Sequence, residues 1–406
     1  MRIVDALPKM ILKEALDAEL RVLPEYDTSI PEMDAGSRLL ALNNVYSLFV
    51  PTTMSREIYA KLYAALYRAL ERKDSLEAVQ QSNHIFRVKM GIPSSAVALG
   101  SDSLTLIGRS GIGKSRCISE ALRVIAGKNL IEIEDPFRKI IPVVMVQTPF
   151  DCSVKSLLLA ILQETDRQLN TSYYDYAVRN RATTDVLIMT VSQMSLQHIG
   201  MIIVDEIQNC IKAKNGRNLI GCLTQLINNA GIAVVMVGTP ECTDFFEAEM
   251  HLARRSSGLR FTEMKYGEEF REICKYLFSY QYVCARPVLT EDLCLWMWEK
   301  TQGNVSILVG MVIAAQEQAI LSGREILDRK SLQEAYDQRL ASLHVFLQPK
   351  KQYMHKRKRT EERTQENTFS RNLDSSFLEA IHSARKQSMD PVKSLVEKGL
   401  LKEIEV

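Results

Sequence analysis

The sequence predicts an α/β protein with a parallel sheet flanked by helices, together with a helical N-terminal region, a small all-α region and a charged C-terminal tail. Three observations carry this prediction. Short apolar runs alternate with amphipathic stretches between residues 101 and 264, which is typical of β-α-β units. A glycine-rich loop joins the first apolar run to the first amphipathic stretch. From about residue 265 the apolar runs stop, and amphipathic helical patterns follow one another.

The composition is that of an ordinary globular protein with more than one domain. Of the 406 residues, 46% are hydrophobic and 25% are charged, which excludes a fully disordered or fibrous chain. The net charge is only +2, so binding to nucleic acid would depend on a local group of basic residues or on many subunits acting together. We expect four regions, which are a helical region at 1–100, an α/β core at 101–264, an all-α region at 265–345 and a charged linker and tail at 346–406.

No membrane segment is expected. The longest apolar run, residues 230–237, is far shorter than the roughly 20 residues that cross a bilayer. Charged residues interrupt the first twenty positions, unlike in a signal peptide. The eight cysteines form no C-x-x-C pair, so we expect reduced, buried thiols in a cytoplasmic protein.

The clearest element before the core is a helix expected over residues 56–74. Leu62, Leu66 and Leu70 recur at i, i+4 and i+8, with three tyrosines alongside, and Ser55 is a suitable N-cap. This stripe could be part of the core or could dock a partner.

The core itself contains four helices and five strands by the same patterns. The expected strands are residues 103–108, 131–134, 142–147, 201–205 and 232–238. The expected helices are residues 114–126, 153–169, 184–197 and 218–229.

The glycine-rich loop fits the pattern G-x-x-x-x-G-K-[ST], placed between a strand and a helix as a phosphate-binding loop requires. It consists of Gly108, Arg109, Ser110, Gly111, Ile112, Gly113, Lys114 and Ser115, followed by Arg116. Glycines let backbone N–H groups curl round a phosphate, and the following helix N-terminus adds partial positive charge. We expect Lys114 to reach the β- and γ-phosphates of ATP and Ser115 to bind Mg²⁺. A purely structural glycine turn is the alternative.

A second motif is the apolar strand 201–205, which ends in two adjacent carboxylates. Asp205 is expected to complete the Mg²⁺ shell through water, and Glu206 to polarise the water that attacks the γ-phosphate. A solvated strand end is the alternative. The two motifs together predict an enzyme that hydrolyses a nucleoside triphosphate.

Three segments carry a resemblance to a known family: LTLIGRSGIGKSRC, IIVDEIQNCIKAKNG and VVMVGTPECTDFFEAEMHLARRSSG. Over roughly residues 84–320 the chain resembles the TnsC-type AAA+ regulators of targeted-insertion transposons, which are related to TniB, IstB and MuB. The resemblance implies an AAA+ P-loop ATPase core followed by a lid over residues 265–345. It also implies a bacterial, cytoplasmic homo-oligomer, ring or filament, that forms on double-stranded target DNA of any sequence when ATP is bound.

Partners follow from the same resemblance. A target selector of TnsD or TniQ type would bind the oligomer, the N-terminal region being a candidate for that docking. The transposase subunits TnsB and TnsA would be recruited, with the tail as a candidate contact, and ATP hydrolysis would disassemble the oligomer. The choice between a fixed attachment site and an RNA-guided, CRISPR-associated complex for targeting stays open.

Further site residues are implied by position in the family pattern. Thr239 resembles the polar residue that orients the attacking water, the alternative being a plain turn residue. Arg254 or Arg255, with Arg260 nearby, resembles the arginine finger that one subunit offers to its neighbour. A basic helix end is the alternative for these arginines. The lid turn at 303–306 lacks the arginine that many AAA+ lids place on the nucleotide, so we expect slow or partner-dependent hydrolysis.

DNA contacts in this family lie at the N-termini of the two helices between the glycine loop and the Asp-Glu strand. The corresponding residues here are Lys155 and Thr183, followed by Ser153, Arg181 and Thr184. Such helix starts with hydroxyl and basic side chains bind phosphates without reading sequence. The alternative is a set of helix caps and solvated side chains. A basic cluster at residues 350–363 could contact DNA, dock a transposase or be a solvated linker.

Two other functions fit the motifs less well. One is a helicase loader or origin-binding ATPase of related fold, which a helicase partner would distinguish. The other is a scaffold that ATP locks on DNA without turnover.

Overall fold

The computed structural model describes residues 2–340, apart from short gaps at 28, 96–98, 100–102, 128–129, 135–136, 213–215, 244–245 and 247–255. The described residues belong to one compact unit, residues 1–342. Arg254, Arg255 and the basic cluster at 350–363 lie outside the described residues.

A six-stranded sheet lies at the centre of this unit, in the order β2-β3-β4-β5-β1-β6. Its strands are β1 (Ser103–Gly108), β2 (Ile131–Ile133), β3 (Arg138–Gln147), β4 (Ile199–Asp205), β5 (Ala233–Gly238) and β6 (Ser256–Phe261). All neighbouring strands pair in parallel except β2 and β3, which form an antiparallel edge. The carboxyl ends of the parallel strands therefore meet at one edge of the sheet.

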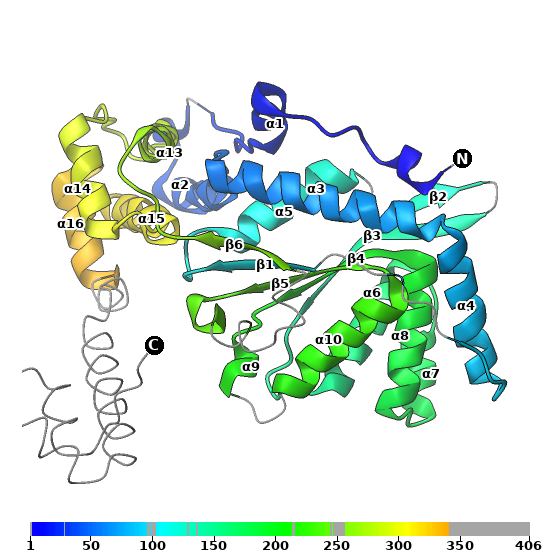
Figure 1. Cartoon of the computed structure of the whole chain (residues 1–406). Coiled ribbons are helices and arrows are strands. Elements are labelled where there is room, and N and C mark those ends of the chain that lie inside the picture. Colours follow the sequence, from blue (N-terminus) through cyan, green and yellow to red (C-terminus); the bar gives the residue numbers. More distant parts are fainter. Residues whose placement is uncertain are drawn as a thin grey trace, which may run out of the picture. The chain divides into compact units, whose positions relative to one another are not determined.

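Helices cover both faces of this sheet, as Figure 1 shows, with α3 and α5 on one side and α6, α8 and α10 on the other. Before β1 come α1 (Lys13–Leu20), α2 (Ala35–Leu42), α3 (Thr53–Lys73) and α4 (Leu76–Lys89). The helices between β1 and β5 are α5 (Lys114–Ala126), α6 (Val154–Leu169), α7 (Tyr173–Arg179), α8 (Thr184–His198), α9 (Asn209–Lys212) and α10 (Gly216–Ala230). After β6 come α13 (Glu268–Ser279), α14 (Glu291–Thr301), α15 (Val305–Leu321) and α16 (Arg329–Ala335), which we call the lid helices.

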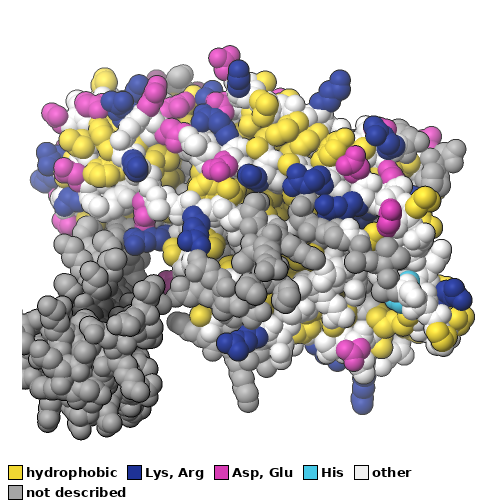
Figure 2. Space-filling view, viewed as in Figure 1, with side chains coloured by type: hydrophobic (Ala, Val, Ile, Leu, Met, Phe, Trp, Pro, Cys, Tyr) yellow, Lys and Arg dark blue, Asp and Glu magenta, His cyan; other side chains and the backbone are white. Residues whose placement is uncertain are grey.

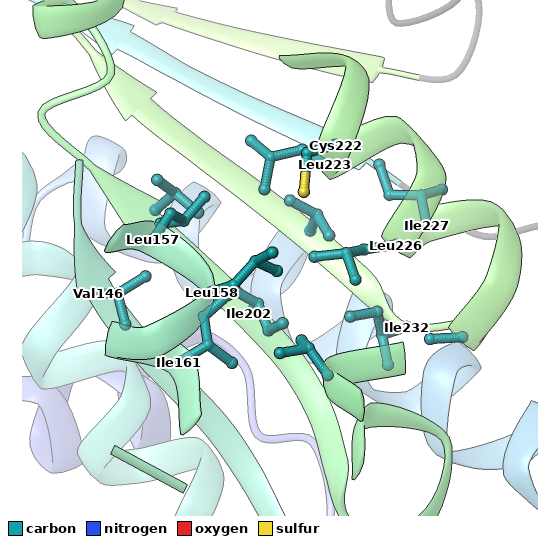
Figure 3. Packing of buried hydrophobic residues seen from close by; sticks show 14 of the residues in the cluster. Val146, Leu157, Leu158, Ile161, Ile202, Cys222, Leu223, Leu226, Ile227 and Ile232 are labelled. Atoms are coloured by element: carbon teal, nitrogen blue, oxygen red, sulfur yellow. The ribbon is translucent and has the colours of Figure 1, made fainter. Parts of the chain in front are cut away.

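Two apolar clusters hold the three layers together. In the first, Leu157 and Ile161 of α6 and Leu226 of α10 pack against Ile202 of β4 (Figure 3). The second contains the leucine stripe of α3, whose three leucines are fully buried together with residues of α5 and the sheet. The stripe is therefore core, and its interpretation as a docking surface is wrong.

The structure corrects three local expectations. Thr52, not Ser55, is the N-cap of α3, and Ser55 at the third helical position donates and accepts in a capping box with it. Arg260 does not end a helix, because it lies in β6, which pairs with β1. Helix α7 was not expected. In a capping box both the N-cap and the residue three positions later carry polar side chains, so the sequence alone does not tell which one is the N-cap. Strand β6 carries too few apolar residues to be recognised without its partner strand.

Gly200 in β4 shows how closely α3 packs on the sheet. A Cβ atom there would lie 2.6 Å from Leu66 Cδ1 and 2.7 Å from the carbonyl oxygen of Pro142. Because that carbonyl belongs to the neighbouring strand, it cannot move aside without disturbing the sheet. We expect Gly200→Ala to lower the free energy of unfolding by about 1–3 kcal/mol, measured by urea denaturation. The control is Gly221→Ala in α10, where a Cβ meets nothing within 4 Å and stability should hold or rise. Equal losses in both variants would contradict the close packing.

Two global expectations concern membranes and cysteines. Among the described residues, no single helix is long and apolar enough to cross a membrane, and α14 and α15 pass the length and composition test only as a pair bent by 118°. The seven cysteines that the structure describes are free thiols, and all but Cys284 are buried.

Candidate nucleotide site

The glycine loop, residues 108–115, leaves the carboxyl end of β1 and leads into α5. Gly111 and Gly113 have φ values of +82° and +99°, in the left-handed region that favours glycine. At Gly108 a Cβ atom would lie 2.5 Å from Ile112 Cδ1 and 3.0 Å from the carbonyl oxygen of Phe261. The three glycines of the loop are thus needed for its tight curl.

Lys114 begins α5 and turns back over the loop. Its Nζ donates to the carbonyl oxygens of Gly108 at 2.6 Å and Arg109 at 2.9 Å. Burial lowers the pKa of Lys114, while the nearby carboxylates of Asp205 and Glu206 act in the opposite direction. The ammonium group is held in a partly desolvated place, where an anion would gain more from it than in water.

Asp205 lies at the end of β4 and faces the start of α5. Its carboxylate accepts a hydrogen bond from the Ser115 hydroxyl at 3.1 Å, and its side chain is almost fully buried. Thr148, at the end of the adjacent β3, donates through its N–H at 2.9 Å and its hydroxyl at 2.8 Å to the Asp205 carbonyl oxygen. Because strand ends and helix start all hold it, Asp205 is a rigid acceptor.

Glu206 differs from Asp205 in its exposure, its backbone conformation and its hydrogen-bond partner. It is exposed, and it has a φ of +58°, which is uncommon for a residue other than glycine. Its carboxylate accepts a hydrogen bond from the side-chain amide of Gln208. The sequence reasoning missed this contact, although Gln208 stands two residues further along the quoted motif. The adjacent acids therefore separate into a buried one and an exposed one.

Thr239 follows β5 at the same edge of the sheet. Its hydroxyl oxygen is buried and makes no hydrogen bond to an oxygen or nitrogen atom of the described residues. It lines one pocket together with Lys114, Ser115, Asp205 and Glu206. A buried hydroxyl without such a partner fits a polar ligand atom at this place.

This pocket has a volume of about 450 Å³ and is lined by both polar and apolar residues. The polar lining is the glycine loop, the two acids and Thr239. The apolar lining comes from three separate parts of the chain, which are Leu48, Phe49 and Val50 before α3, Ile273 and Leu277 of α13, and Val305 and Val309 of α15. A pocket that offers a cation, loop N–H groups and apolar side chains suits the phosphates and the base of a nucleotide. No motif marked the apolar lining.

The two arginines of the loop region, Arg109 and Arg116, form ion pairs within the protein. Arg109 pairs with Glu263 at 2.9 Å. Arg116 pairs with Glu120 at 3.1 Å and donates to the carbonyl oxygen of Ser47 at 2.8 Å. Both tie the glycine loop and α5 to neighbouring segments.

The donor set is also suited to a divalent cation. No group of three or more His, Cys, Asp or Glu that could hold a metal ion occurs among the described residues. Mg²⁺ binds through one or two protein oxygens and takes its other ligands from water and substrate phosphates. The Ser115 hydroxyl and the Asp205 carboxylate are such oxygens and already lie together.

The expected DNA-binding residues are at helix starts, as the sequence indicated. Ser153 caps α6 and Thr183 caps α8, each hydroxyl accepting an N–H three residues further on at 3.4 Å. Lys155, Arg181 and Thr184 are exposed. Acidic side chains stand close by in sequence, Asp151 before α6 and Asp185 in the first turn of α8. The two hydroxyls are thus used as caps, which leaves the basic side chains and the other N–H groups of the first turns for a ligand.

With this geometry in place, comparison with known proteins identifies the core. Residues 95–266 match the model of the family described as bacterial TniB protein. Over this range the chain is similar to that family. The matched range contains every strand of the sheet, the glycine loop, both acids and Thr239, whereas the lid helices lie outside it.

Several solved structures are similar to this chain, at low identity and with TM-scores below 0.5. They include the Aeropyrum pernix ORC1 protein in complex with DNA (13% identity, TM-score 0.43, covering 64% of each chain). Others are Drosophila ORC bound to DNA (14% identity, TM-score 0.47, 98% of this chain and 85% of that one) and domain III of Thermotoga maritima DnaA (13% identity, TM-score 0.37, 58% and 83%). The chain spans 64% of the length of the Aeropyrum pernix protein. No curated protein matches the sequence. The six-stranded, mostly parallel sheet flanked by helices confirms the predicted α/β core.

Proposed function

We propose that this protein is an ATPase that assembles on double-stranded target DNA and regulates transposition. The observation that carries the proposal is the pocket in which Lys114, Asp205, Glu206 and Thr239 converge within the segment similar to the TniB family. The glycine loop and Lys114 bind the β- and γ-phosphates, and the apolar lining contacts the base. Ser115 and Asp205 hold Mg²⁺, which neutralises phosphate charge when it is bound.

Hydrolysis in this proposal depends on the exposed acid. Glu206 accepts a proton from the attacking water, and the Gln208 amide orients the carboxylate. Thr239 supplies a hydroxyl to the same pocket. Arg254 or Arg255 of a neighbouring subunit completes the charge stabilisation, which makes turnover depend on assembly.

The partners we propose are those of a bacterial cytoplasmic regulator of targeted insertion. A target selector of TnsD or TniQ type binds the assembly, and the transposase subunits TnsB and TnsA are recruited to it. Disassembly follows ATP hydrolysis. The range matched to the TniB family supports this assignment.

DNA binding in the proposal is electrostatic and distributed over many subunits. Figure 2 shows Lys and Arg side chains interspersed with acidic and hydrophobic ones on the described part of one face, without a single large basic area. In the proposal each subunit contacts phosphates through Lys155 and Arg181, beside the capped starts of α6 and α8. Repetition along an oligomer adds these contacts together.

The first test is fluorescence anisotropy of a labelled random-sequence duplex titrated with the full chain. We expect steep, cooperative binding with a non-hydrolysable ATP analogue and little binding with ADP or without nucleotide. Binding that ignores the nucleotide, or no binding in any state, would overturn the proposal.

The same anisotropy titration is repeated with the Lys155→Ala variant. Because the contact is to phosphate, we expect affinity to fall by a similar factor for every duplex sequence, with a shallower dependence on salt. Lys61→Ala is the control, since Lys61 is exposed on α3, on the opposite face of the sheet (Figure 1). A loss restricted to particular sequences would argue against a phosphate contact.

A further inference from the structure

The turn that begins α15 contacts the glycine loop directly. The side-chain Nδ2 of Asn304 donates to the carbonyl oxygen of Ser110 at 3.0 Å. The N–H of Ser306 donates to the carbonyl oxygen of Gly111 at 2.9 Å. Asn304 also caps α15, because its Oδ1 accepts the N–H of Ile307 at 3.2 Å. Asn304 is 4% exposed, so both of its bonds are made away from water.

The surroundings leave this turn little freedom. Gly303 has a φ of +75°, and a Cβ on it would lie 1.9 Å from the carbonyl oxygen of Met264. That same oxygen accepts the indole N–H of Trp298 at 2.9 Å, and the N–H of Met264 donates to the Gly303 carbonyl oxygen at 3.2 Å. On the other side, a Cβ on Gly111 would lie 2.7 Å from Asn304 Oδ1. The amide of Asn304 is therefore fitted against the glycine loop.

These bonds orient the peptide groups of the loop. In a trans peptide the C=O of one residue and the N–H of the next point in opposite directions. With the carbonyls of Ser110 and Gly111 turned to the lid helices, the N–H groups of Gly111 and Ile112 point away from the lid. Lys114 binds the two preceding carbonyls, so four successive carbonyl groups of the loop have hydrogen-bond partners.

We propose that Asn304 is a positioning residue of the phosphate site, which aims the N–H group of Gly111 at the β-phosphate through the Ser110 carbonyl that it holds, while the N–H of Ser306 holds the next peptide group. This inference rests on the proposed nucleotide binding and adds to it the part of the ligand that the lid recognises. The lid is linked to the loop that binds the diphosphate, and it makes this link with no arginine in the 303–306 turn. It follows that the lid contact serves ADP and ATP alike.

The test separates this role from that of a helix cap. Asn304→Ser keeps an oxygen that can cap α15, but the shorter side chain cannot reach Ser110. Asn304→Asp keeps the cap and the length and removes the donor. We expect both variants to weaken the binding of ADP and of ATP by the same factor, about five- to tenfold for the lost hydrogen bond. AMP, which lacks the β-phosphate, should bind as it does to the wild type. Calorimetric titration of the full chain with the three nucleotides measures this.

The matched control is Thr290→Ala, which removes the cap of α14 but no contact to the loop. It should lower the melting temperature and leave the ratio of ADP to AMP affinity unchanged. Equal losses for AMP and ADP in Asn304→Ser, a loss limited to ATP, or no loss would each overturn the inference. Absence of ADP and ATP binding in the wild type would instead overturn the nucleotide site itself, and the inference with it.

Discussion

Lys114→Ala is expected to abolish nucleotide binding, with the dissociation constants for ATP and ADP rising by about a hundredfold or more. Lys114 is the cation of the glycine loop in the pocket, and burial already lowers its pKa, so its charge is poorly compensated by water. Two charge-assisted hydrogen bonds to phosphate, each worth about 1.5–3 kcal/mol, account for a loss of that size. Titration with a fluorescent ADP analogue measures the change.

The substitution also frees the carbonyls of Gly108 and Arg109, which Lys114 binds in the folded protein. Lys114→Met, which retains the apolar stem, therefore accompanies it, and a melting curve shows that both variants fold. Lys61→Ala serves again as the control. Near-normal affinity for ADP in a folded Lys114 variant would mean that the glycine loop does not bind phosphate.

Glu206→Gln is expected to lower ATP turnover by a factor of about 10² to 10⁴ while ATP affinity stays within a few-fold of the wild type. The change removes the base and keeps the size of the side chain. The positive φ at position 206 does not depend on the Glu206 side chain, because the N–H of Glu206 donates to Asp205 Oδ1 at 2.8 Å. Phosphate release under saturating ATP measures turnover.

The same variant separates a regulated ATPase from a passive scaffold. If hydrolysis drives disassembly, Glu206→Gln should remain on DNA in ATP much longer than the wild type. Glu77→Gln, an exposed change on α4, should dissociate at the normal rate. Equal lifetimes of the wild-type and Glu206→Gln assemblies would mean that hydrolysis has no regulatory role, and the ATP-locked scaffold would be the better description.

The polar lining of the pocket could be predicted from sequence because its residues belong to local patterns. Gly108, Gly111 and Gly113 are required by the curl of one short loop, and Lys114 and Ser115 follow at once on the helix. Asp205 and Thr239 each end an apolar run, and parallel strands bring their carboxyl ends to one edge. Knowing the order of the strands was not necessary to expect these groups near one another.

The apolar lining could not be predicted in the same way. Leu48 and Phe49 precede the core by some fifty residues, and Ile273 and Val305 follow it, with nothing in their spacing to connect them. They meet because α3 packs on the sheet and the lid helices return beside β6 (Figure 1). Contacts of this kind depend on the packing of layers, which single-sequence patterns do not encode.

Asn304 illustrates the difference between features that local sequence patterns predict and features that depend on tertiary contacts. By itself the sequence determined the α/β core, the leucine stripe of α3, the glycine loop and the paired acids, because each follows from periodicity or from stereochemistry within a few residues. Only the tertiary structure decided that β6 joins the sheet and that the buried Asn304 of the lid turn contacts the glycine loop. The physical reason is that these depend on long-range contacts between buried polar groups, whose partners are fixed by the packing of the whole chain and not by their neighbours in sequence.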